Sequence, residues 1–464
     1  MSNTYDVVVV GGGAVGENAA ARAVRGGLTV ALVEGELLGG ECSYWACMPS
    51  KALIRTTQAV HSARALKGVT ASFDPADVLS RRDSFTSGWK DDGQVAWAEG
   101  AGITFLRGHA RVTGPKAVSV EGGPDLVATH AVVLATGSVP REPSTPGLAD
   151  TPHWSSREAT SAKAVPARLA VVGSGVVGCE LAQAFQRLGS QVTLISRGPV
   201  VLAELEPAAS ELVAKGLADD GVTLHLGVDV SRVHRDAAGV HVLLADGTDV
   251  VADELLVATG RKPATADVGV ETVGLEPGAT LEVDDSGLVK GVDGRWLYAC
   301  GDVTARAPLT HQGKYAARVV GDVIAARAKG APELTAPWGA HSATADHTAI
   351  PQVVFTDPEV AFVGRTVKQV RAAGIDHEVV EIDIAVAGSS LHADGYTGKA
   401  TMVIDRERRT LLGVTFVGRD VAELVHAGTV AIVGEVPLDR LWHAVPAYPT
   451  INEVWLRLLE AYGL

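Results

Sequence analysis

The chain has 464 residues and a formal net charge of −14, with 47% hydrophobic and 20% charged residues, which is the composition of a soluble globular protein. An acidic chain without a Lys/Arg-rich run is not expected to bind nucleic acid or an anionic membrane, and no apolar run approaches the ~20 residues of a membrane span. We expect a cytoplasmic protein, because the N-terminus lacks a signal-peptide pattern and four cysteines are too few for a secreted disulfide scaffold.

The first predicted element is a buried strand that runs into a glycine turn and then a helix. Asp6-Val-Val-Val-Val leads into Gly11-Gly-Gly13-Ala-Val-Gly16. Glycine lets the backbone approach a pyrophosphate closely, and the N-terminus of the helix offers free N–H groups to it. The next strand, predicted over 28–33, ends at Glu34, whose carboxylate can accept hydrogen bonds from ribose hydroxyls. Strand, turn, helix and acid together predict a dinucleotide-binding unit.

Two cysteines, Cys42 and Cys47, lie five residues apart in the sequence ECSYWACMPSK. Five residues span at least about 7.5 Å in a helix and roughly 16 Å in a strand, whereas a disulfide needs Cα atoms within about 6.8 Å. The pair can therefore join only across a distorted turn, which Pro49 favours, and a strained bridge is easily reduced. We interpret the pair as redox-active in preference to two inert thiols. A metal site is not predicted, because no second cysteine pair with zinc-site spacing is present.

The strand–turn–helix pattern occurs a second time, at Gly173-Ser-Gly175-Val-Val-Gly178. Where the first copy has its acid, the second has Ser196 followed by Arg197. Removing a carboxylate and supplying a guanidinium suits the 2′-phosphate of NADP, because a carboxylate would repel that phosphate and arginine can bind it. The second unit is therefore predicted to bind NADPH, with NADH as the weaker alternative.

Two dinucleotide-binding units in one chain predict two cofactors, which we assign as one bound flavin, FAD, and one exchangeable nicotinamide. Two near-identical apolar strands end in Thr-Gly, at Thr136-Gly137 and at Gly260, and are expected to close the two units. A further short strand stops at Asp302. Ligands bind at the carboxyl ends of strands in open α/β sheets, so this aspartate is expected beside a cofactor.

In this order and combination the motifs resemble the class I pyridine nucleotide–disulfide oxidoreductases, which include dihydrolipoamide dehydrogenase, glutathione reductase, mercuric reductase and soluble transhydrogenase. The resemblance extends into the C-terminal third, where 351–364 is similar to the start of the family's interface domain. It implies an α/β fold with two Rossmann-like dinucleotide-binding domains and a C-terminal α+β interface domain, in a homodimer. The implied boundaries are 1–148 and 266–335 for the FAD domain, 149–265 for the NAD(P) domain and 345–464 for the interface domain.

The resemblance also implies roles for individual residues. Cys47 would be the sulfur nearest the flavin, and Cys42 the outer sulfur that meets the substrate. Lys51 would lie beside the flavin and pair with Glu180, favouring negative charge on the flavin and the thiolate. The first turn of a later helix would direct backbone N–H groups at the pyrimidine edge of the flavin. Its residues are Leu309, Thr310 and His311.

The C-terminal motif departs from the family pattern. Disulfide reductases of the family supply His-Pro-Thr-x-x-Glu across the dimer, whereas this chain reads Tyr448-Pro-Thr-Ile-Asn-Glu453. A phenol with a pKa near 10 is a poor base at pH 7, and losing a general acid–base costs about 10²–10⁴-fold in rate. Mercuric reductase and soluble transhydrogenase also carry tyrosine here. The former adds a C-terminal cysteine pair and the latter lacks the first cysteine of the motif, so the chain matches neither.

From these patterns we predict an FAD-dependent NAD(P)H oxidoreductase that passes electrons through the flavin and a Cys42–Cys47 disulfide to a small disulfide or quinone-like acceptor. One alternative is a dihydrolipoamide dehydrogenase-type subunit of a multienzyme complex. Another is a flavin-binding redox sensor without turnover. Tyr44 and Trp45, between the cysteines, are either part of the core or an aromatic wall beside Cys42.

Overall fold

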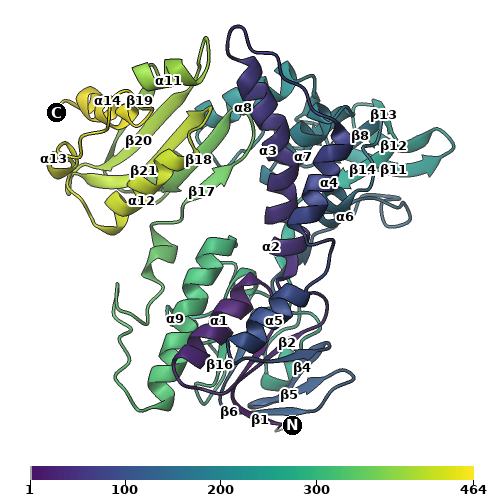
Figure 1. Cartoon of the computed structure of the whole chain (residues 1–464), viewed down its shortest axis with the longest axis vertical. Coiled ribbons are helices and arrows are strands. Elements are labelled where there is room, and N and C mark those ends of the chain that lie inside the picture. Colours follow the sequence, from purple (N-terminus) through teal and green to yellow (C-terminus); the bar gives the residue numbers. More distant parts are fainter. Residues whose placement is uncertain (1–2) are drawn as a thin grey trace. The chain divides into compact units, whose positions relative to one another are not determined.

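The computed structural model of the chain describes residues 3–464, which form two compact units (Figure 1). Of the described residues, the first unit comprises 3–49, Asp83–Arg141 and Arg261–Asp346. The second unit comprises Ser50–Arg82, Glu142–Gly260 and His347–Leu464. The domain boundaries drawn from the family resemblance stay a prediction.

The first unit contains a seven-stranded sheet with the order β3-β2-β1-β6-β5-β4, in which β16 also pairs with β6. Its strands are β1 (Thr4–Val10), β2 (Val30–Glu34), β3 (Thr104–Arg107), β4 (Ala110–Gly114), β5 (Ala117–Val120), β6 (Leu126–Leu134) and β16 (Leu297–Ala299), and a separate antiparallel pair is formed by β7 (Ser138–Pro140) and β15 (Arg261–Pro263). Its helices are α1 (Ala14–Arg25), α2 (Gly40–Tyr44), α5 (Asp92–Gly100) and α9 (Thr310–Ala328), with short 3₁₀ turns η1 (Val270–Val273) and η2 (Asp302–Thr304).

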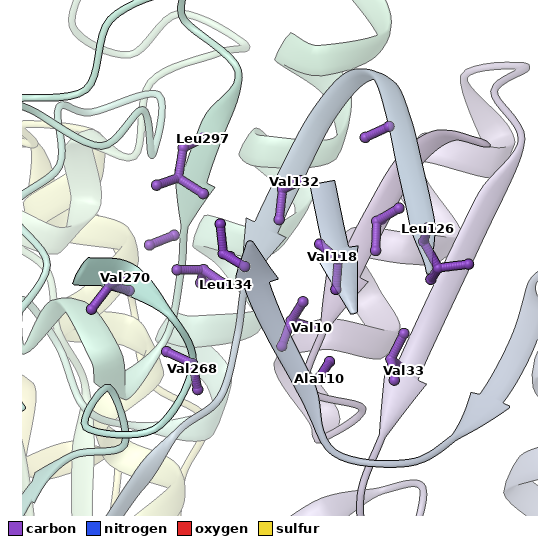
Figure 2. Packing of buried hydrophobic residues seen from close by; sticks show 14 of the residues in the cluster. Val10, Val33, Ala110, Val118, Leu126, Val132, Leu134, Val268, Val270 and Leu297 are labelled. Carbon is purple, nitrogen blue, oxygen red and sulfur yellow. The ribbon is translucent and has the colours of Figure 1, made fainter. Parts of the chain in front are cut away.

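The strand β1 lies between β2 and β6 in parallel register. Both of its faces are buried, because Val8 and Val10 belong to one core cluster and Val7 and Val9 to another. This explains its uninterrupted valines, since alternation with polar residues occurs only where one face meets water. One face packs into a core with β4, β5 and β16, where Val10, Val118 and Leu297 belong to one cluster (Figure 2). Helices α1 and α9 pack together, with Gly321 of α9 against Arg22.

The strand predicted over 28–33 begins and ends later than expected, as β2 (Val30–Glu34). The backbone N–H of Leu28 donates to the carbonyl of Ala23 and so closes the end of α1, which removes Leu28 from the sheet. Glu34 is the last residue of the strand.

The second unit contains three sheets. A parallel sheet has the order β10-β9-β8-β14, and the other two are antiparallel, β11-β12-β13 and β17-β18-β21-β20-β19. The strands are β8 (Arg168–Val172), β9 (Gln191–Ser196), β10 (Thr223–Leu226), β11 (Val230–Asp236), β12 (Gly239–Leu244), β13 (Asp249–Ala252), β14 (Glu254–Val257), β17 (Gln352–Val354), β18 (Glu359–Gly364), β19 (His377–Asp383), β20 (Lys399–Asp405) and β21 (Thr410–Gly418).

Helices surround these sheets. They are α6 (Ser156–Ser161), α7 (Val176–Arg187), α8 (Pro207–Asp219), α10 (Val367–Ala372), α11 (Ala387–His392), α12 (Val425–Val433), α13 (Leu438–Leu441) and α14 (Glu453–Tyr462), with the 3₁₀ turn η4 (Ala422–Leu424). Three elements cross a unit boundary, namely α3 (Cys47–Arg64), α4 (Pro75–Phe85) and the 3₁₀ turn η3 (Thr344–His347).

The predicted fold class is confirmed. In each unit a parallel strand, β1 or β8, leads through a glycine turn into a helix, and the C-terminal part is an antiparallel sheet packed with helices α12 and α14. Among residues 3–464, none of the helices combines the length and the apolar character that a membrane crossing requires.

Candidate active site

The glycine turn of the first unit connects β1 to α1 in a shape that other residues could not adopt. Gly11 has a φ of +98°, and a Cβ on it would lie 2.5 Å from the carbonyl oxygen of Ala135. A Cβ on Gly16 would lie 1.8 Å from the carbonyl oxygen of Gly11. Gly13 precedes α1 without a side-chain cap, which leaves the first N–H groups of the helix available to an anion.

The turn of the second unit, between β8 and α7, repeats this geometry closely. Gly173 has a φ of +116°, and its Cβ would lie 2.4 Å from the carbonyl oxygen of Ala258. A Cβ on Gly178 would lie 1.9 Å from the carbonyl oxygen of Gly173. Gly175 precedes α7 without a side-chain cap, and a Cβ on it would meet nothing within 4 Å, so the space before the helix is open. Both turns therefore fit a dinucleotide pyrophosphate.

The two units differ at the end of the second strand. Glu34 accepts a hydrogen bond from the backbone N–H of Gly12 at 2.8 Å, in the first unit. In the second unit the hydroxyls of Ser196 and Ser174 lie 2.7 Å apart at the corresponding place, and Arg197 is exposed beside them. The second unit thus has a neutral hydroxyl pair where the first has a carboxylate, so no acid at that strand end competes with a phosphate for the guanidinium.

Cys42 and Cys47 stand on either side of a break between two helices. Cys42 lies in α2, which ends at Tyr44, and Cys47 is the first residue of α3. Between them, Trp45 has a φ of −137° and a ψ of 0°, which is not helical. The chain therefore has at this point the distorted turn that a bridge between the two cysteines requires.

The hydrogen bond to Cys47, together with burial, raises the pKa of the Cys42 thiol far above its usual range. The hydroxyl of Thr310 and the charge of Lys314 act in the opposite direction on the same pKa. The Sγ of Cys47 lies 3.3 Å from Oγ1 of Thr310. The raised pKa favours a proton on Cys42, and Cys47 lies beside the first turn of α9.

Helix α9 begins at Thr310 after Leu309, and no side chain caps its N-terminus. His311 is exposed on the same first turn. Gly313 packs against Val15 of α1, where a Cβ would lie 2.6 Å from the valine side chain. The first turn of α9 is therefore held against the first turn of α1.

The N-terminus of α2 is also held at the first glycine turn. A Cβ on Gly40 would lie 2.7 Å from the Cα of Gly13. The start of α1 thus lies against the starts of α2 and α9, and Cys47 contacts the start of α9. The N-termini of the longer helices α1 and α9 provide positive potential for an anionic cofactor.

Asp302 begins the turn η2, because β16 ends at Ala299, three residues earlier than predicted. Its carboxylate accepts a hydrogen bond from the hydroxyl of Ser138 at 2.6 Å. The guanidinium of Arg261 donates to the hydroxyl and the carbonyl of Ser138 at 2.7 and 2.6 Å, and lies 3.3 Å from Glu41. Asp302 is therefore fixed at the carboxyl end of the sheet by a chain of polar contacts.

The two Thr-Gly strand ends have different surroundings. The hydroxyl of Thr136 donates to the carbonyl of Ala264 at 2.7 Å, and the carbonyl of Gly137 accepts from the N–H of Ala264 at 3.0 Å. Gly260 follows β14 with a φ of +120° and open space where a Cβ would be. Each marks the end of a strand next to a glycine turn.

In the second unit, Lys51 donates to Oε2 of Glu180 at 2.7 Å, and the other oxygen of Glu180 accepts from the backbone N–H of Phe355 at 2.9 Å. The Lys51 ammonium also lies 5.0 Å from the centre of the Phe355 ring. The structure thus brings the two residues together, on α3 and α7, with Glu180 buried.

Tyr448 lies in the loop before α14, and Glu453 is the first residue of that helix. Tyr448 is 76% exposed, whereas Glu453 is buried and accepts a hydrogen bond from Arg457 at 2.6 Å. The second carboxylate oxygen of Glu453 is buried without a hydrogen-bond partner among the described residues. Tyr448 therefore projects from this chain, and Glu453 retains one oxygen for a further group.

The alternatives left open for the two aromatic residues between the cysteines are partly resolved. Tyr44 is buried and its carbonyl accepts from the indole N–H of Trp89, so this ring belongs to the core. Burial raises the pKa of Tyr44 to about 12, which keeps the phenol neutral. Trp45 is half-buried, with its ring centre 5.7 Å from that of Tyr44.

Glu17, in the first turn of α1, is a buried carboxylate beside the glycine turn that the sequence patterns did not single out. Only 8% of the residue is exposed, and Oε1 has no hydrogen-bond partner among the described residues. Burial, opposed by Lys314 and reinforced by the charge of Glu34, raises the pKa of Glu17 to about 7. A signal existed in the sequence, because a glutamate follows directly after the last glycine of the turn, where a buried helix face is expected.

Comparison with protein families gives two matches. The model for the pyridine nucleotide-disulphide oxidoreductases matches residues 5–330, and the model for the dimerisation domain of the same group matches residues 350–458. Together the two models match all of residues 5–458 except 331–349.

Similarity to individual proteins extends over nearly the whole chain. Dihydrolipoyl dehydrogenase of Thermus scotoductus is 33% identical over 99% of this chain and 97% of its own length. Mercuric reductase of Staphylococcus aureus is 29% identical over 97% of this chain and 81% of its own. Among solved structures, the HOCl-induced flavoprotein disulfide reductase RclA from Escherichia coli has a TM-score of 0.84 at 24% identity, covering 98% of this chain and 99% of RclA.

Proposed function

The chain belongs to the pyridine nucleotide-disulphide oxidoreductase family, and on this basis we propose that it takes electrons from NADPH and passes them, through FAD and the Cys42–Cys47 pair, to a small disulfide or quinone-like acceptor. It is an enzyme of a family that contains FAD and uses NAD(P)H. The observation that carries the proposal is the cysteine pair at the break between α2 and α3, with Cys47 3.3 Å from Thr310.

The cofactor positions follow from the two glycine turns. FAD would be held by the first turn, with Glu34 at its ribose and the start of α9 at its ring. NADPH would be held by the second turn. When bound, FAD supplies the conversion of a hydride into an electron pair that a disulfide can accept. The residues of the chain position it and set the charge around it.

The cysteine pair would accept two electrons and pass them on by thiol–disulfide exchange. Breaking the Cys42–Cys47 bond consumes two electrons and one proton, and it leaves a thiol on Cys42 and a thiolate on Cys47. The raised pKa of Cys42 supports this distribution of charge. Cys42 then attacks one sulfur of an acceptor disulfide and displaces the other, which takes the proton of Cys42 and leaves as a thiol. Attack by Cys47 on the mixed disulfide releases the second product thiol, once protonated, and restores the pair.

Support for NADPH over NADH comes from the end of β9. Ser196 presents a hydroxyl where the FAD unit has a carboxylate, and Arg197 is exposed next to it. Changing Arg197→Glu should raise KM for NADPH at least tenfold and leave KM for NADH within about twofold, since the change acts on the 2′-phosphate alone. An equal effect on both coenzymes would contradict this assignment.

The acceptor is expected to be small or to have a good leaving group. Tyr448 stands where the family has its histidine, and a phenol transfers protons poorly at pH 7. Release of a weakly acidic thiol, such as that of a lipoyl group, depends on such proton transfer. This weighs against the role of a dihydrolipoamide dehydrogenase-type subunit.

We also propose a homodimer. The family model over residues 350–458 is a dimerisation domain, and this part of the chain leaves large apolar side chains exposed. Val445 is 84% exposed, and Val430, Val433 and Tyr448 are also exposed. Such side chains are unfavourable in water and typical of an interface. Size-exclusion chromatography coupled to light scattering should give twice the chain mass, and an active monomer would contradict the proposal.

The function is tested by an acceptor screen with NADPH. An aromatic disulfide and a para-quinone are compared in the unaltered protein, in Cys42→Ser and in the control Cys179→Ala, which removes a buried cysteine outside the pair. The proposal expects disulfide reduction to fall at least 100-fold in Cys42→Ser and to stay within about threefold in the control. Undiminished disulfide reduction in Cys42→Ser would refute the proposal. Oxidation of dihydrolipoamide with NAD⁺ at a higher rate than the reduction of either acceptor with NADPH would also refute it.

A further inference from the structure

The three-stranded sheet β11-β12-β13 of the second unit has two faces of different character. Val233, Val240 and Val242 point into a buried core with residues of β8 and β14. Alternation along the strands places His234, Asp236 and His241 on the opposite face. His234 and Asp236 are exposed and His241 is half-buried, so this cluster is open to solvent. None of the three residues belongs to the redox machinery described above.

The strand register holds these three side chains together. His234 of β11 lies directly opposite His241 of β12, and Asp236 is two residues further along β11. The two imidazole rings are stacked, with centres 4.6 Å apart and planes 14° from parallel. One ligand atom from each of the three residues lies within 4.8 Å of the other two.

One of the three pairs of ligand atoms already has the spacing of a metal site. Zinc bonds of about 2.0–2.1 Å in a tetrahedron place neighbouring ligand atoms about 3.3 Å apart. Nε2 of His241 lies 3.1 Å from Oδ1 of Asp236. Closing the site therefore requires a side-chain adjustment of His234 and no change of backbone register.

A second carboxylate fixes the orientation of His241. Nδ1 of His241 lies 2.9 Å from Oδ2 of Asp249, on the neighbouring strand β13. Ligating histidines commonly donate their second ring N–H to a carboxylate, which sets the tautomer and strengthens the other nitrogen as a ligand.

We infer that His234, Asp236 and His241 form a binding site for a zinc-class divalent transition-metal ion, with Asp249 as the supporting carboxylate. Two imidazoles and one carboxylate suit Zn²⁺, Ni²⁺ or Cu²⁺ better than Mg²⁺ or Ca²⁺, which prefer oxygen ligands. Three protein ligands leave a fourth position to water. Protein ligands bind such an ion in their deprotonated forms. Arg232, the other charged residue of β11 on this face by alternation, adds positive charge that Asp249 and Asp236 offset.

The test is calorimetric titration with Zn²⁺ of the oxidised holoenzyme, in which the cysteine pair is bridged and cannot compete. The unaltered protein is compared with His234→Ala, Asp249→Asn and the control His109→Ala. His109 is an exposed histidine of the first unit whose ring lies 3.3 Å from Asp267. Among the described residues it belongs to no group of three potential metal ligands. It therefore reports what a single His–Asp pair contributes.

The site predicts one Zn²⁺ per chain, with affinity at least 100-fold weaker in His234→Ala, 10–100-fold weaker in Asp249→Asn and unchanged in His109→Ala. No binding by the unaltered protein, or binding that is equally strong in His234→Ala, would overturn the inference. Thermal unfolding of each variant without metal checks that the exposed substitutions leave the fold intact.

Discussion

The substitution Glu17→Gln should make the protein more stable at alkaline pH. Glu17 is buried on α1 with one carboxylate oxygen lacking a hydrogen-bond partner in the described part of the chain. Burial raises its pKa from 4.5 to about 7 in the folded protein. Between these values the folded state holds a proton that the unfolded chain has lost, so stability falls as the pH rises through this range. Glutamine keeps the shape and has no charge to bury.

The magnitude follows from the pKa difference. A shift of about 2.5 pH units, at about 1.36 kcal/mol per unit, corresponds to at most about 3 kcal/mol of unfolding free energy lost above pH 7. The loss is complete above the folded pKa and absent below pH 4.5. Glu17→Gln should therefore differ little from the unaltered protein at pH 5 and be more stable by up to about 3 kcal/mol at pH 8.

The assay is urea unfolding of the holoenzyme at pH 5 and pH 8, with matched flavin content. Midpoints are compared directly, because a chain with several domains need not unfold in two states. The control is Glu99→Gln, which changes an exposed glutamate of the same unit. The reasoning is wrong if Glu17→Gln and the unaltered protein show parallel pH profiles, or if Glu99→Gln gives the same gain at pH 8.

Three other predictions concern the fold and the cofactor assignment. Asp357→Asn should cost about 3 kcal/mol, because Asp357 is buried and pairs with Arg187 at 2.8 Å, and the urea midpoint should fall more than in the exposed control Asp439→Asn. Gly16→Ala should lower the flavin-to-protein ratio at least tenfold, since the new methyl group meets a carbonyl oxygen at 1.8 Å. Gly178→Ala, with a contact of 1.9 Å, should retain flavin and raise KM for NADPH at least tenfold; loss of flavin in this variant would contradict the assignment of the two turns.

The parts of the fold that local sequence patterns determine were predictable. The two glycine turns are specified by residues within one strand–turn–helix unit, and their geometry is nearly the same in both copies. The break between the cysteine-bearing helices agrees with the distorted turn predicted there, while the bridge itself stays a prediction, because both cysteines are free thiols in this structure. The end of α1 was not predictable to the residue, because the closing bond of Leu28 depends on how the chain leaves the helix.

Contacts between segments that are far apart in the chain could not be predicted from the sequence. Arg261 reaches Ser138 and Glu41 because β15 pairs with β7, and nothing near Arg261 in the sequence indicates that pairing. The cluster of His234, Asp236 and His241 likewise arises from cross-strand register. The Lys51–Glu180 pair was expected only from the family resemblance, because the two residues are far apart in the chain and neither shows its partner by pattern.

The central claim is that the cysteine pair stores electrons delivered by NADPH through the flavin, and anaerobic titration with NADPH tests it most directly. If Cys42 and Cys47 take part, the oxidised enzyme should consume two NADPH per flavin, one for each two-electron centre, and Cys47→Ser should consume one. An end point at one NADPH per flavin in the unaltered protein would contradict the account, because the flavin alone would then hold all the electrons.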